Sequence, residues 1–249
     1  MGTRSLTLVY HNGKYVIAQY GQWDGYPEGN GVKILTFLLD PTNLPKLLAN
    51  LDNLYVPDEA ELEEYNRQAE QVSSAAHEAR YDREAYAQLN FDEQRIVQDR
   101  MSNPLKIVCP SLSRDTGAGI LQLVAETKAR VPIQLEPDFI EDTLFCEWAY
   151  VVNVDEGELE AYAGNHVGME GRHSFADRKS RPALMGLWRL DDLPSEKQFL
   201  ADIKEVLEFD QEEGDIVEEH SDEENGIKRE GIEGDQSGSE DEDEEAIVV

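Results

Sequence analysis

Basic residues are scarce in this chain. Its 249 residues include 22 Lys and Arg against 53 Asp and Glu, which gives a formal net charge of −31 at pH 7. Proteins that bind DNA or RNA neutralise phosphates with clusters of Lys and Arg. A strongly acidic chain repels such polyanions, so the composition argues against nucleic acid as a partner and favours a basic protein.

Long apolar runs and targeting signals are also lacking. The mainly apolar runs, such as 34–39, are far shorter than the roughly 18 residues that indicate a membrane span. The short apolar stretch after Arg4 leads directly into polar residues 11–13, which is not the pattern of a secretory signal peptide. We therefore predict an intracellular protein, cytoplasmic or nuclear, with no membrane contact.

Cysteine is rare, and the common cofactor motifs are missing. Cys109 and Cys146 have no Cys or His neighbours at the spacing of zinc ligands, so we expect two buried, reduced thiols and no metal site. The Gly-rich phosphate loop that ends in Gly-Lys-Ser/Thr is absent, as is the dinucleotide fingerprint. The sequence therefore predicts no cofactor.

What the chain does have is a concentration of acidic residues at its end. Residues 205–249 contain 20 acidic and two basic residues, and 237–245 contain no apolar residue. Such a segment cannot bury enough apolar surface to offset the entropy lost on ordering, so we predict a disordered acidic tail over 208–249. Its role is either solvation or electrostatic attraction of a basic partner.

The beginning of the chain predicts a β-hairpin. Residues 5–10 and 15–20 both have the composition of strands, and they are separated by a turn that contains Asn12-Gly13. Asn-Gly is a strong hairpin signal because both residues tolerate a positive φ.

The remainder predicts one α+β domain over 1–207, with a long helical insertion at 58–101. The pattern indicates an antiparallel sheet built from the N-terminal hairpin and C-terminal strands, with packed helices. Asp58 and Glu61 have the spacing of a capping box at the start of the insertion. The expected helices are 32–39, 43–54, a long one that Asp58 caps and whose apolar stripe reaches Ala79, 91–101, 116–130 and one from Ser195. The expected strands are 145–154, 158–162 and 183–190, while 105–110 is ambiguous and is interpreted as extended.

The stretch 21–31 is the best candidate for a functional site, because four glycines and a proline in eleven residues predict a loop. Glycines allow close approach of a ligand to the backbone, and aromatic rings supply an apolar wall. The antiparallel hairpin places residue 4 at the same end as this loop. We predict a small-molecule pocket lined by Arg4, Gln22, Trp23, Asp24 and Tyr26. In the competing interpretation, Trp23 and Tyr26 fill the core and Asp24 pairs with Arg4.

The N-terminal segment resembles a known family. Gly2-Thr3-Arg4, a short hairpin, Gln22-Trp23-Asp24-Gly25-Tyr26-Pro27-x-Gly29-x-Gly31 and a helix are similar to a family of uncharacterised proteins from fungi, bacteria and phages. The similarity is specific over 2–39 and looser at 113–118 and 147–162, while 58–101 and the tail look like additions. No activity is known for the family, so the resemblance implies a domain and not a reaction.

Three functions follow from these patterns, and the sequence leaves open whether the protein is an enzyme and which oligomer it forms. The first is a ligand- or partner-binding domain with a pocket at 21–31. The second is an amide hydrolase of the N-terminal-nucleophile type, in which Thr3 would act after processing that removes both Met1 and Gly2. The third is an interaction protein that uses its acidic tail to hold basic partners.

Overall fold

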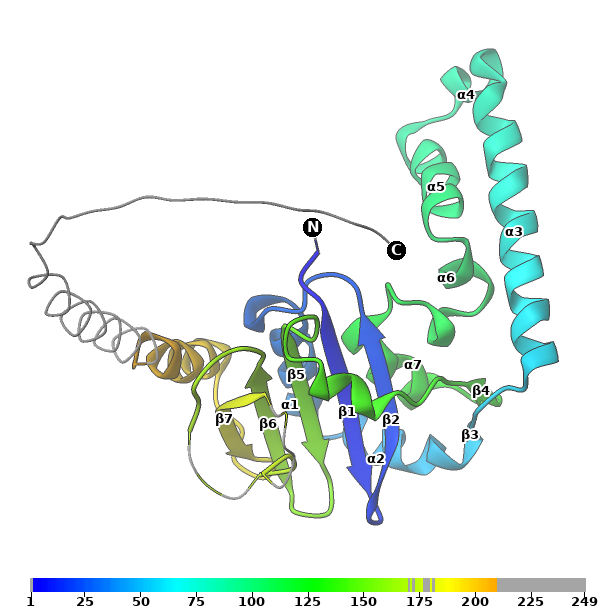
Figure 1. Ribbon diagram of the computed structural model, residues 1–249. Helices are drawn as coiled ribbons and strands as arrows, with labels where there is room; N and C mark the ends of the chain where they lie inside the picture. The colour runs from blue at the N-terminus through cyan, green and yellow to red at the C-terminus, as the bar shows by residue number, and fades with distance from the viewer. Residues whose placement is uncertain (1, 170, 172, 177–179, 181, 210–249) are drawn as a thin grey trace, which may run out of the picture. The chain divides into compact units, whose positions relative to one another are not determined.

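The computed structural model describes residues 2–169, 171, 173–176, 180 and 182–209. The predicted disordered tail therefore lies outside the described residues from position 210 onward. Within the described residues, five strands form one sheet in the order β2-β1-β5-β6-β7, and two short strands, β3 and β4, form a parallel pair (Figure 1). The strands are β1 Ser5–His11, β2 Lys14–Gly21, β3 Leu54–Tyr55, β4 Val131–Pro132, β5 Trp148–Asn153, β6 Glu158–Ala163 and β7 Ala183–Arg189.

Helices occupy most of the chain between β2 and β5. A π-helical turn at 27–31 leads into α1, and 3-10 turns lie at 51–53, 110–112, 117–119 and 137–141. After β7, residues 196–209 are helical and are called the C-terminal helix below. The α-helices are α1 Val32–Leu39, α2 Asn43–Asn50, α3 Glu59–Tyr81, α4 Arg83–Gln88, α5 Phe91–Ser102, α6 Pro104–Val108 and α7 Ile120–Glu126.

The α+β class is confirmed, but the sheet is mixed and not wholly antiparallel. The pairs β1/β2, β5/β6 and β6/β7 are antiparallel, as predicted, whereas β1 and β5 run parallel with Leu8 opposite Val151. Parallel neighbours need a long crossover connection. Here the crossover contains all of α1 to α7, so the two hairpins meet through strands that lie far apart in the sequence.

The predicted N-terminal hairpin is confirmed, including its turn. Asn12 and Gly13 have φ values of 53° and 75°, the left-handed conformation that their sequence predicted. The turn is also held from outside, because the Asp155 carboxylate accepts hydrogen bonds from the backbone N–H groups of Asn12 and Gly13, each at 2.8 Å. The tips of the two hairpins, β1/β2 and β5/β6, are thereby joined.

This junction should weaken in acid. The hydrogen bonds from the Gly13 and Asn12 amides lower the pKa of Asp155, helped by the nearby His11. A carboxyl whose pKa is lowered by folding stabilises the native state above its unfolded pKa of about 3.9, and that contribution is lost as the pH falls through the lowered value. We expect the amide protons of Asn12 and Gly13 to lose hydrogen-exchange protection as the pH falls below about 4. Asp155→Asn should remove this acid dependence, and a wild-type profile that stays flat would contradict the assignment.

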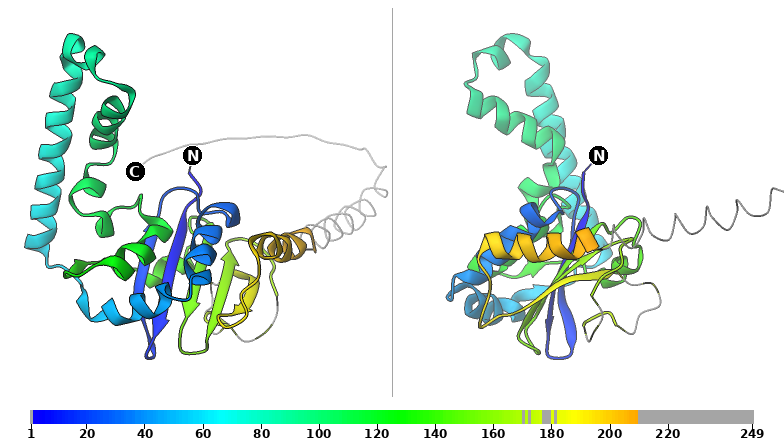
Figure 2. Two further views of the ribbon diagram at one scale, coloured as in Figure 1. Left: turned by 180° about the vertical axis from the view of Figure 1, so that it is seen from behind. Right: turned by 90° about the vertical axis from the view of Figure 1, so that its left-hand side faces the viewer.

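The sheet buries apolar side chains on both faces. One cluster packs β1, β5 and β6 against α1, α2, α7 and the C-terminal helix, which cover the same face of the sheet (Figure 2). The second cluster lies on the other face and includes Leu6, Leu8, Val151, Tyr162 and Phe175. Because successive residues of a strand point to opposite faces, β1 contributes to both clusters and is buried along most of its length.

Two predictions about the middle of the chain were wrong. Residues 104–108 form α6 and not an extended segment; Pro104 takes the first helical position, where its missing N–H costs nothing. The helix predicted for 116–130 is a 3-10 turn followed by α7, which ends at Glu126. Asp115, just before this turn, accepts a hydrogen bond from the Trp23 indole at 2.8 Å.

Both cysteines are free and buried, as predicted. Burial raises the pKa of the Cys146 thiol to about 12, with Asp142 and Glu147 adding to the effect. The neutral thiol is therefore the stable form at physiological pH.

Candidate functional site

The loop after β2 is anchored to the start of β1 through its backbone. Ser5 lies opposite Gly21 in the hairpin, and the Gly25 N–H donates to the Thr3 carbonyl oxygen at 2.9 Å. A Cβ atom on Gly25 would lie 2.8 Å from that oxygen, so only glycine allows this approach. The loop and the first residues of the chain are thus in direct contact, as the hairpin topology predicted.

Asn30 holds the loop together from the inside. Its side chain is almost fully buried, and its amide donates to the Ser5 hydroxyl at 3.0 Å and to the Trp23 carbonyl at 3.2 Å. Its backbone N–H donates to the Asp24 carbonyl at 2.7 Å. One buried residue therefore ties β1 to two consecutive residues of the loop.

The backbone at Asp24 is strained. Asp24 has a φ of 55°, which is uncommon for a residue other than glycine, and it precedes the π-helical turn of residues 27–31. Conformations of this kind cost about 1–3 kcal/mol and persist where the surrounding structure enforces them, often at functional sites. The close packing of Gly29 against the Asp24 backbone, and of Gly25 against the backbone of Thr3 and Arg4, supplies that enforcement.

In the sequence, the strained residue is flanked by two half-exposed aromatic residues. Trp23 is 48% exposed and Tyr26 is 41% exposed. These rings therefore do not fill the core, which contradicts the competing interpretation. The Trp23 indole N–H donates to Asp115 at 2.8 Å, and the Tyr26 hydroxyl lies 3.4 Å from the Asp24 carboxylate. The surface formed by Trp23, Asp24, Tyr26 and Asp115 is called the aromatic-acidic surface below.

A buried hydrogen bond from the sheet holds the loop backbone that carries this surface. The Tyr150 hydroxyl on β5 donates to the Gly25 carbonyl at 2.9 Å, and full burial raises the pKa of Tyr150 well above its ordinary value. Tyr150 therefore remains a neutral donor. On the outer side, the Trp23 ring lies so close to Gly2 that a Cβ atom there would be 2.1 Å from the ring.

Arg4 does not form the ion pair with Asp24 that the competing interpretation predicted. Its guanidinium bonds the Glu147 carboxylate at 3.2 Å and lies 4.7 Å from the centre of the Phe145 ring. The alternation of the strand explains this, because Ser5 points toward Asn30 and the neighbouring residue 4 points to the opposite face. The cation that approaches Asp24 is Lys33, with Nζ 3.9 Å from the carboxylate.

Gln22 lies within the loop and Thr3 contacts it, and both help to hold the loop in place. Gln22 accepts a hydrogen bond from the Tyr20 hydroxyl at 2.8 Å, and its backbone N–H donates to the Arg114 carbonyl. Thr3 immediately precedes β1. The hydrolase hypothesis that uses Thr3 stays a prediction, as does the small-molecule pocket.

A buried polar cluster on β6 was not found from the sequence. Glu160 is 1% exposed, and its carboxylate accepts hydrogen bonds from the Tyr162 hydroxyl and from the Ser174 hydroxyl, the latter at 2.9 Å. Burial and the Glu160 charge raise the pKa of Tyr162, which therefore stays protonated. His173, which lies 3.2 Å from the Tyr162 hydroxyl, borders a cavity of about 500 Å³. The signal in the sequence that could have revealed this cluster is Glu160, an acidic residue at an inward-facing position of a buried strand.

No helix in the described part of the chain has both the length and the apolar character needed to cross a membrane. Over the same residues there is no group of three or more His, Cys, Asp or Glu side chains placed to hold a metal ion.

Comparison of the chain with models of protein families, with curated proteins and with solved structures gives no match. The resemblance of residues 2–39 to the fungal, bacterial and phage family therefore stays a prediction.

Proposed function

We propose that this protein is a binding protein whose aromatic-acidic surface holds a cationic group, such as the guanidinium of an arginine on a basic partner. The observation that carries this proposal is the pair of half-exposed rings, Trp23 and Tyr26, each within hydrogen-bond distance of a carboxylate. The Tyr26 hydroxyl lies 3.4 Å from Asp24, and the Trp23 indole N–H donates to Asp115 at 2.8 Å. A cation over the face of an aromatic ring gains roughly 0.5–2 kcal/mol. Carboxylates at Asp24 and Asp115 add direct hydrogen-bond acceptors.

The rigidity of the loop favours binding. The glycine contacts, the buried Asn30 and the Tyr150 hydrogen bond fix the backbone before any ligand arrives. Groups that are already ordered lose little conformational entropy on association, so more of the contact energy appears as affinity.

The position of Lys33 supports the proposal that the ligand group is a cation. Lys33 lies beside Asp24 at 3.9 Å, and both side chains are 57% exposed. An exposed pair of this kind contributes at most about 1 kcal/mol. A guanidinium that also contacts the rings can therefore displace the Lys33 ammonium from the same carboxylate.

The proposal is tested by titrating the full chain with a blocked Gly-Arg-Arg-Gly peptide and following the three tryptophan indole N–H signals by NMR. We expect the Trp23 signal to move, because its N–H is bonded to Asp115, while the signals of Trp148 and Trp188 stay in place. Asp24→Asn should weaken the peptide affinity about fivefold to tenfold, corresponding to the loss of a charged contact of about 1 kcal/mol or more.

Two controls separate this surface from general attraction to an acidic protein. Asp192→Asn removes the same charge from an exposed turn and should leave the titration unchanged. A Gly-Glu-Glu-Gly peptide should not move the Trp23 signal. If the arginine peptide binds without shifting the Trp23 signal, the aromatic-acidic surface is not the site.

A further inference from the structure

A second surface lies on the helical arm, defined as residues 59–108 with α3, α4, α5 and α6. A groove of about 570 Å³ runs between α3 and the pair α5 and α6. Its lining on α3 extends from Gln68 to Ala79, a rise of about 17 Å or three helical turns. The apolar side chains that line it are Val72, Ala75, Ala76, Ala79, Val97, Ile107 and Val108.

The arm buries little of its own apolar surface. In α3 only Ala69 and Ala76 are buried, and α4, α5 and α6 contain no buried residue. Ile96 and Ile107 are 48% and 51% exposed. Most helical stability in proteins comes from packing of an apolar face, so an arm of this kind gains stability when another element covers it.

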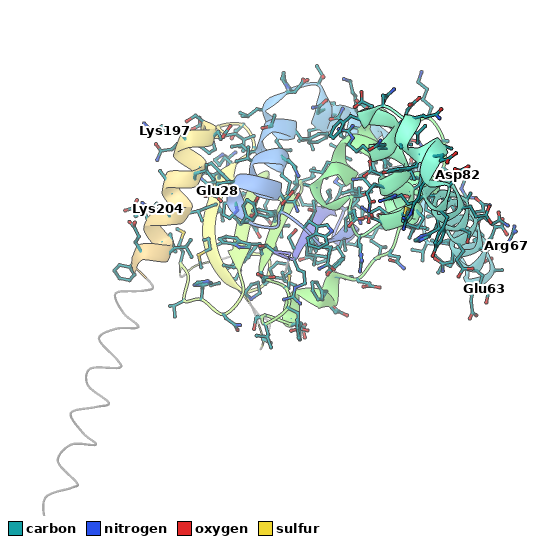
Figure 3. All side chains as sticks on the ribbon, turned by 90° about the horizontal axis from the view of Figure 1, so that it is seen from above. Glu28, Glu63, Arg67, Asp82, Lys197 and Lys204 are labelled. Carbon is teal, nitrogen blue, oxygen red and sulfur yellow. The ribbon has the colours of Figure 1, made fainter. Side chains whose placement is uncertain are left out.

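The net charge of the helical arm indicates which kind of helix could cover the groove. The arm carries 11 acidic and six basic residues. Helical spacing places Glu78 three residues after Ala75, on the α3 side of the groove. Glu64 lies on the same side, but its carboxylate is paired with Arg67 at 2.6 Å. Arg100 is the basic residue of the lining. Glu63 and Arg67, in contrast, lie on the outer side of α3 (Figure 3).

We infer that this groove receives an amphipathic helix of a partner protein, with apolar side chains on one face and lysines or arginines beside them. About three turns of such a helix match the length of the groove, with apolar anchors at i, i+3, i+4 and i+7. The protein's own C-terminal segment is a poor occupant because residues 205–249 carry 20 acidic residues and two basic ones. The helical arm of a second copy of the chain is also a poor occupant, because both arms carry an excess of negative charge and repel each other.

The test uses a fluorescent 14-residue peptide with leucines at helical spacing and lysines elsewhere, titrated with the full chain at 150 mM salt and followed by anisotropy. Ala75→Trp places a large side chain in the groove at an exposed position, and we expect it to weaken binding at least tenfold. Asn66→Trp places the same side chain on an exposed position of α3 outside the groove lining, and we expect a change below twofold. Ala79→Gln provides a second groove variant. Circular dichroism checks that all variants keep their helices.

Further measurements distinguish the proposed partner helix from other occupants of the groove and from general electrostatic attraction. A peptide of the same composition without helical spacing should bind more weakly and be insensitive to Ala75→Trp. Equal binding of that peptide, or unchanged binding by both groove variants, would overturn the proposal. A wild-type dimer that Ala75→Trp dissociates would assign the groove to a second copy. If the protein's own C-terminal end occupied the groove, Val248→Asp would weaken that contact and free the groove for the peptide. A tenfold gain in peptide affinity from Val248→Asp would therefore assign the groove to the protein's own C-terminal end. Asp24→Asn should not affect this peptide, so this inference and the proposed function can fail separately.

Discussion

Replacing Phe199 by alanine is expected to lower the free energy of unfolding by about 4 kcal/mol, the usual range for a buried phenylalanine being about 3–5 kcal/mol. Phe199 is completely buried on the C-terminal helix, its ring centre lies 4.6 Å from that of Trp188, and it packs next to Gly31 at the end of the loop. Domains are commonly stable by only about 5–15 kcal/mol. Urea unfolding should show a much lower midpoint with an unchanged slope.

Phe209 provides a matched control for this experiment. It lies on the same helix, but its side chain is 64% exposed. Phe209→Ala removes the same atoms without leaving a cavity, so its effect should be within about 0.5 kcal/mol. If the two substitutions cost the same, the C-terminal helix does not pack on the sheet through Phe199.

Replacing Gly29 by alanine is expected to cost about 3 kcal/mol and to disturb the aromatic-acidic surface. A Cβ atom on Gly29 would lie 2.2 Å from the Asp24 carbonyl oxygen. That oxygen accepts the Asn30 N–H at 2.7 Å, so the backbone cannot move away without breaking a hydrogen bond. Crowding of this kind typically costs about 1–3 kcal/mol, and here it involves two backbone segments. Chemical denaturation measures the stability, and the Trp23 indole signal reports on the loop.

Gly119 tests whether this effect is specific. Its φ is −62°, and the nearest atom to an added Cβ would be 3.8 Å away. Gly119→Ala should leave the protein equally stable or stabilise it by up to about 1 kcal/mol, because alanine reduces the entropy of the unfolded chain. A Gly29→Ala protein as stable as the wild type would show that the loop adapts, and the argument for a preorganised surface would fail.

Local signals in the sequence predicted local structure well. The Asn12-Gly13 turn has the expected positive φ values, and the Asp58–Glu61 capping box forms with both of its hydrogen bonds. The predicted helix 91–101 is observed as α5, Phe91–Ser102. Such features depend on residues a few positions apart, whose geometry the chain determines on its own.

Features that depend on distant residues were not predictable in the same way. The parallel pairing of β1 with β5 has no signature near either strand. The partner of Arg4 is Glu147, which lies 143 positions away, and only the pleat of β1 decides which face the guanidinium occupies. The exposure of Trp23 and Tyr26 likewise follows from packing around Asn30 and Gly2, so the sequence could name these residues but not place them.

The parallel junction between β1 and β5 also has a consequence during translation. The ribosome adds about 5–20 residues per second, so roughly 7 to 29 s separate the emergence of β1 from that of β5, its parallel neighbour. Throughout this interval the nascent hairpin exposes one unpaired edge, which invites pairing with other chains. The helical arm is synthesised during the same interval and contains mainly local contacts, which form quickly. We therefore expect closure of the sheet to be a late step in folding, with the β1 edge exposed until β5 has been synthesised.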